Sequence, residues 1–177
     1  MSAESRSLGW VERLWDRVHP PRTVYAHCDI PCGIYDPHEA QIAALTVIRM
    51  DQLIAELAHP APDAKLEERA TYVSKMARYT SVKEQHSELV KQQIRVIWGD
   101  YFTPDHVKQF PQVNDLVFRI LKQASKCRQG IAVADAQDLL KLVQDFAEIF
   151  WQTKGAKTQR QPSMQKPGGE LVVPVAA

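Results

Sequence analysis

The chain has 177 residues, enough for one domain with a sizeable core, and its 22 Lys and Arg nearly balance its 21 Asp and Glu. A net charge of +1 gives no general reason to expect a nucleic acid or an anionic membrane as partner. Three cysteines are too few for a disulfide-stapled secreted scaffold, and no long uncharged apolar run or secretory signal is present, so we expect a cytoplasmic protein without stable membrane insertion.

Residues 1–26 combine a short amphipathic helix with a proline break. Pro20 and Pro21 end the helix, and a small residue, Ala26, follows. This pattern favours two interpretations equally: a cleavable leader, which would need a leader-processing protease, or a helix docked on the domain. The apolar side chains that recur at helical spacing in this segment are Trp10, Val11, Leu14, Trp15 and Val18.

Four amphipathic helical runs follow. The first begins at Asp36 and stops before "HPAPDA", and the second spans about Ala64 to Trp98. The third starts near Pro104, with a bend or delayed start expected at Pro111, and the fourth covers about residues 133–153. Short links between amphipathic helices predict an all-α protein, an antiparallel up-and-down four-helix bundle.

The last segment, residues 155–177, reads "GAKTQRQPSMQKPGGELVVPVAA". It is rich in glycine, proline and glutamine and offers no sustained apolar face. We therefore predict a flexible C-terminal tail.

Soft metal ligands are concentrated in "YAHCDIPCGIYDP", where His27 directly precedes Cys28 and Cys32 follows four residues later. Structural zinc sites usually have two such pairs, so zinc fits poorly. A local disulfide between the cysteines is one interpretation. A metal site is the other, and the adjacent histidine and a reducing compartment favour it.

Cleavage after Ala26 would free the α-amine of His27. That amine, the Cys28 amide nitrogen and the thiolates of Cys28 and Cys32 form a possible planar set of four donors, with the His27 imidazole at an axial position. Planar nitrogen and sulfur donors suit nickel(II) or copper(II) better than zinc. Gly33 permits the positive φ that a tight turn around the ion would need.

The stretch "HCDIPCGIYDP" resembles the N-terminal nickel hook of the nickel-containing superoxide dismutases, and "KEQHSELVKQQIRVIWGDYF" and "EIFWQTK" resemble later blocks of that family. The likeness covers His27 to about Lys154 and implies a superoxide dismutase domain over residues 27–154, with the hook at 27–37. It implies a nickel ion held by His27, Cys28 and Cys32 that cycles between Ni(II) and Ni(III) to convert superoxide to dioxygen and hydrogen peroxide. It also implies a leader over residues 1–26 and a homohexamer.

The resemblance further implies supporting roles. Tyr35 matches a hook tyrosine that bounds access to the metal and holds substrate or water, Asp29 a residue that orders the hook, and Tyr101 a second tyrosine near the site. The chain departs from the family where a glutamate and an arginine support the axial histidine, because Ala43 and His86 stand there. We take His86 as the candidate replacement support.

Without the resemblance, the residues themselves leave two other functions open. One is a non-catalytic helical bundle that stores or delivers nickel or copper, which should exchange its ion and show no turnover. The other is a helical interaction module in which the hook is a disulfide clip, which should need no metal.

Overall fold

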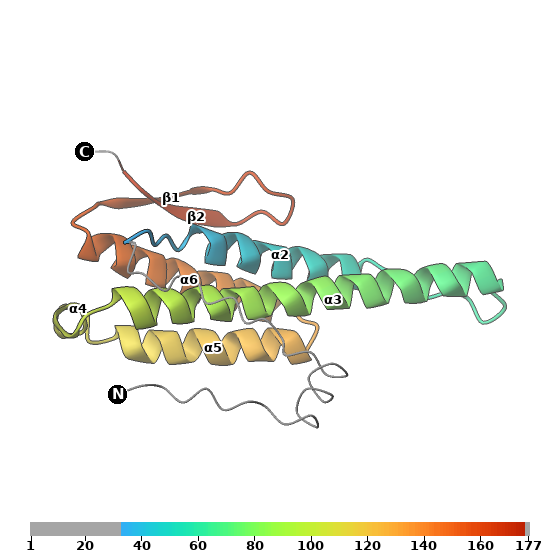
Figure 1. Cartoon of the computed structure of the whole chain (residues 1–177). Coiled ribbons are helices and arrows are strands. Elements are labelled where there is room, and N and C mark those ends of the chain that lie inside the picture. Colours follow the sequence, from blue (N-terminus) through green and yellow to red (C-terminus); the bar gives the residue numbers. More distant parts are fainter. Residues whose placement is uncertain (1–32, 176–177) are drawn as a thin grey trace, which may run out of the picture. The chain divides into compact units, whose positions relative to one another are not determined.

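The computed structural model describes residues 33–175, and most of these are helical (Figure 1). The predicted leader and hook residues 27–32 lie outside the described residues. Within residues 33–175, no helix has the length and apolar character needed to span a membrane. The elements in chain order are α2 (His38–Ala55), α3 (Leu66–Val96), the π-helix η1 (Ile97–Tyr101), α4 (Pro104–Gln109), α5 (Val113–Gln129), α6 (Val133–Thr153), β1 (Thr158–Pro162) and β2 (Glu170–Pro174).

The four long helices pack in a closed cycle. Helix α2 lies against α3 and α6, and α5 lies against the same two helices. Their apolar faces meet in one core in which Ile94, Ile120, Phe146 and Phe150 are fully buried. The prediction of a mostly helical protein is confirmed, and the core buries much of the apolar stripes that predicted the helices, although Val73 of α3 is 63% exposed.

The third predicted run is two helices, as Pro111 indicated. Thr103 caps α4 by accepting a hydrogen bond from the His106 backbone N–H at 3.3 Å, and Pro104 occupies the first helical position. The helix ends at Gln109, and α5 begins only after Pro111, whose ring and missing N–H do not allow a continuous helix.

Helix α3 ends at Val96, where the chain widens into the π-helix η1 that runs on to Tyr101. Trp98 in this turn donates its indole N–H to Asn114 Oδ1 at 2.9 Å and ties the turn to α5. A π-turn widens the helix by one residue and so changes the direction of the side chains that follow. The position of Tyr101 depends on this local feature.

A buried ion pair joins α2 to α3. Lys83 Nζ lies 4.0 Å from Asp51 Oδ1, and both side chains are 1% exposed. Lys83 also donates a hydrogen bond to the Gly130 carbonyl. Burial raises the pKa of Asp51, although the charge of Lys83 and the backbone of Ala132 oppose the rise. The pair fixes an antiparallel register in which Asp51 faces Lys83.

The C-terminal segment is folded, so the predicted flexible tail and the predicted all-α class are wrong for residues 158–174. Strands β1 and β2 pair as an antiparallel hairpin that contacts α2 and α6. Leu171 and Val172 are buried, and Gly169, at φ 79°, lies so close to the helices that an added Cβ would sit 3.1 Å from Leu140. The short run "ELVV" needs only the apolar surface of two helices to become ordered.

A side-chain amide anchors the hairpin. The Gln41 side chain of α2 accepts a hydrogen bond from the Val172 N–H at 2.7 Å and donates one to the Val172 carbonyl at 3.1 Å. Gln41 is fully buried, so both backbone groups depend on it.

Substituting Gln41→Ala is expected to lower the free energy of unfolding by about 2–4 kcal/mol, because a buried donor and a buried acceptor lose their partner. Urea unfolding measures the change. Gln92→Ala, at an exposed helical glutamine, is the matched control and should change stability by less than about 0.5 kcal/mol. Equal losses in the two variants would contradict the anchoring role of Gln41.

Candidate functional site

Two tyrosines that are far apart in the sequence contact each other. Tyr35 lies just before α2, three residues after Cys32, and Tyr101 is the last residue of η1. Their ring centroids are 5.7 Å apart. Tyr101 also packs on Phe150 at 4.8 Å and stacks on His106 at 5.4 Å with an interplanar angle of 25°. The ring of Tyr101 is therefore held from several sides, next to the segment that leaves the predicted hook.

The end of α6 adds a hydroxyl and a positive charge to this cluster. Tyr101 Oη lies 2.8 Å from Thr153 Oγ1. Lys154 Nζ lies 5.3 Å from the ring centroid of Tyr101 and 4.8 Å from that of Phe150. Among residues 33–175, no carboxylate comes within 4.0 Å of Lys154, so aromatic faces rather than an acid hold this cation. The arrangement suits an approaching anion.

Local backbone features orient Tyr35. Gly33 adopts φ 71°, a left-handed conformation that a residue with a side chain rarely takes, as the sequence predicted for the turn. Asp36 Oδ1 accepts a hydrogen bond from the His38 N–H at 2.8 Å where α2 begins. Tyr35 lies between these two features and packs against Tyr101 at the end of η1.

His86 does not join the tyrosines. It precedes Tyr101 by 15 residues of α3 and η1, which is about 22 Å of helix. Its Nδ1 lies 2.8 Å from the Val82 carbonyl, and because a carbonyl only accepts, Nδ1 carries the proton. In the neutral ring Nε2 is then an acceptor. Ala43, its predicted counterpart on α2, is buried.

The predicted ligands His27, Cys28 and Cys32, and Asp29 with them, lie outside the described residues, so their predicted roles stay predictions. Within residues 33–175, no group of three His, Cys, Asp or Glu side chains is arranged to hold a metal. The remaining cysteine, Cys127, is buried, and burial raises its pKa to about 12. Its thiol stays protonated at neutral pH and is a poor ligand.

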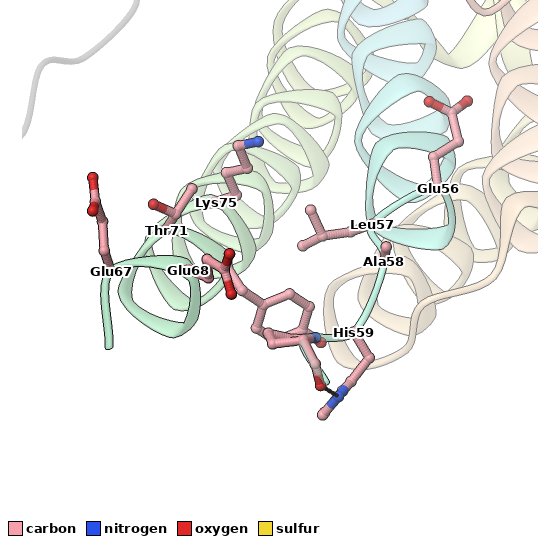
Figure 2. Close-up of a pocket in the computed structure, with 10 residues that line it drawn as sticks. Glu56, Leu57, Ala58, His59, Glu67, Glu68, Thr71 and Lys75 are labelled. Carbon is pink, nitrogen blue, oxygen red and sulfur yellow. Dashed lines mark hydrogen bonds between the residues drawn. The ribbon is translucent and has the colours of Figure 1, made fainter. Parts of the chain in front are cut away.

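A surface hollow of about 730 Å³ lies at the opposite end of α2 and α3, where α2 ends and α3 begins (Figure 2). Its lining includes both acidic residues, such as Glu56 and Glu68, and the basic residue Lys75. His59 packs on Tyr72 with ring centroids 5.3 Å apart. None of the predicted site residues lines it, and we assign it no role in the chemistry.

The sequence patterns did not indicate Thr153, Lys154 or His106 as members of this cluster. A signal was present, because "EIFWQTK" puts Phe150, Thr153 and Lys154 at helical spacing on one face. Only the packing of α6 against η1 reveals that this face meets Tyr101.

Comparison with known proteins gives a consistent result. The family model described as nickel-containing superoxide dismutase matches residues 22–154. The nickel superoxide dismutase of Streptomyces coelicolor is 36% identical over 137 residues, which are 77% of this chain and 95% of that protein. The enzyme of Streptomyces seoulensis is also 36% identical, over 79% of this chain and 98% of its own. A solved native nickel superoxide dismutase superposes with a TM-score of 0.62 at 34% identity, covering 72% of this chain and 99% of its own.

Proposed function

This chain belongs to the nickel-containing superoxide dismutase family, and from that premise we propose how its own residues serve the reaction. The reaction takes two superoxide anions and two protons to one dioxygen and one hydrogen peroxide. Nickel, once bound, supplies the one-electron chemistry by alternating between Ni(II) and Ni(III).

The mature chain starts at His27 after a protease removes residues 1–26. The α-amine and imidazole of His27, the Cys28 amide and the thiolates of Cys28 and Cys32 hold the metal. The chemistry of this donor set fits nickel, since nitrogen donors combined with soft thiolates would suit nickel(II) better than zinc. Asp29 orders the loop that carries the ligands.

Tyr35 and Tyr101 bound the approach to the metal and hold substrate or water beside it. The observation that carries this assignment is the contact between the two rings, because Tyr35 follows the last proposed ligand, Cys32, by only three residues. Lys154 has no carboxylate within 4.0 Å among the described residues 33–175, and its positive charge raises the local concentration of an anionic substrate.

His86 supports the imidazole of His27. Its Nδ1–H is committed to the Val82 carbonyl, so its Nε2 is able to accept a hydrogen bond from a second imidazole.

The domain over residues 27–154 is an antiparallel up-and-down four-helix bundle with a hook, and it assembles as a homohexamer in the cytoplasm. The cyclic packing of α2, α3, α5 and α6 supports the bundle. Two cysteines assigned to a metal support a reducing compartment.

The decisive experiment compares three nickel-loaded proteins: the chain that begins at His27, the same chain with one glycine before His27, and the full precursor. We expect superoxide dismutation only from the first, because an extra residue converts the ligand amine into an amide. Equal turnover by the extended chain would contradict the amine ligand. Bound nickel without turnover in all three proteins would favour the metal-handling alternative. The absence of bound nickel would favour a disulfide clip between the hook cysteines.

A further inference from the structure

The hydroxyl of Thr153 has two neighbours and a single proton. Thr153 Oγ1 lies 2.6 Å from the Phe150 carbonyl, one helical turn earlier, and 2.8 Å from Tyr101 Oη. A carbonyl oxygen only accepts hydrogen bonds, so the Thr153 proton goes to Phe150. The Tyr101 hydroxyl must then be the donor in its bond to Thr153.

We infer that Thr153 is a positioning residue that commits the phenolic proton of Tyr101 to helix α6, so that Tyr101 presents only acceptor lone pairs to the substrate side. The inference rests on the proposed function for its meaning in the reaction. The hydrogen-bond direction itself follows from the two contacts and requires no metal.

The consequence concerns the protons of the reaction. Each hydrogen peroxide formed takes up two protons, and a donor must hold its proton toward the substrate. The Tyr101 proton points into a chain that ends at the Phe150 carbonyl. Those protons therefore reach peroxide from groups other than Tyr101, and Tyr101 orients water or substrate as an acceptor.

The ring of Tyr101 is held independently of Thr153, which makes the inference testable. Tyr35, His106 and Phe150 contact the ring, and Lys154 lies over it. A change confined to the Thr153 hydroxyl should alter the hydrogen bond and leave the ring in place.

The test uses nuclear magnetic resonance of the metal-free full chain with tyrosine labelled by ¹³C at the Cζ atom. Tyr101→Phe identifies the Tyr101 signal. We expect Thr153→Val, which keeps the shape and removes the hydroxyl, to move that signal, and Thr153→Ser to restore it. Thr46→Val removes a similar hydroxyl-to-carbonyl bond, to Ile42 at 3.0 Å, and should leave the signal unchanged. An unmoved Tyr101 signal in Thr153→Val would overturn the inference.

The second readout is the solvent deuterium isotope effect on turnover of the nickel-loaded chain that begins at His27. Tyr101→Phe should leave this effect unchanged beside a native Thr153, and should change it in the Thr153→Val background, where the Tyr101 proton is released. A change of equal size in both backgrounds would contradict the inference. If the unsubstituted protein shows no turnover, the proposed function fails, while the Cζ signal still decides the role of Thr153.

Discussion

Replacing Cys28 or Cys32 with serine is expected to abolish nickel binding by the protein that begins at His27. Each substitution exchanges a soft thiolate for a hydroxyl that stays protonated at neutral pH, so the proposed donor set would lose one of its two sulfur ligands. Metal analysis after dialysis measures the loss as nickel per chain, which should fall from one to near zero. The absorption band from thiolate to nickel should disappear with it.

Cys127→Ala is the matched control, because Cys127 is a cysteine of the same chain whose thiol is buried and whose pKa burial raises to about 12. This variant should keep one nickel per chain. Stoichiometric nickel in Cys28→Ser or Cys32→Ser would show that the assigned sulfur is not a ligand.

Substituting Lys83→Met should lower the free energy of unfolding by about 3–5 kcal/mol, because it removes one partner of a buried ion pair and leaves the other without a counter-charge. The Gly130 carbonyl loses its donor at the same time. Urea unfolding of the single variant gives the midpoint and slope from which the change is obtained.

The double variant Asp51→Leu with Lys83→Met separates charge from packing. Since apolar groups of similar size replace both charges, the double variant should lose at least 1 kcal/mol less than the sum of the single losses. Lys108→Met breaks the exposed pair with Asp105 and should cost less than about 1 kcal/mol. Additive losses in the double variant would mean that Asp51 and Lys83 do not interact.

Much of the helical part was predictable because amphipathic periodicity is a local property. The bend at Pro111 follows from a ring that cannot continue a helix, and the stripe that includes Val117 and Ile120 is the face that α5 buries. The hairpin was not predictable in this way. Only two of its apolar side chains, Leu171 and Val172, are buried, and Gln41 holds it across 131 residues of sequence.

The candidate site also has a part that local sequence patterns predict and a part that depends on long-range packing. The spacing of His27, Cys28 and Cys32 is a chemical signature within six consecutive residues, and it led to a family that the comparisons then matched. The contact of Tyr101 with Tyr35 and Thr153 joins three elements, and no local pattern encodes it.

By itself the sequence determined the helices and the family with its nickel cofactor, because periodicity, proline and ligand spacing act over a few neighbouring residues. Only the tertiary structure decided that the C-terminal segment folds against α2 and α6, that a buried Asp51 meets Lys83, and that the hydroxyls of Tyr101 and Thr153 are hydrogen-bonded. These features depend on which faces meet when helices pack, and packing selects partners by shape and burial across the whole chain.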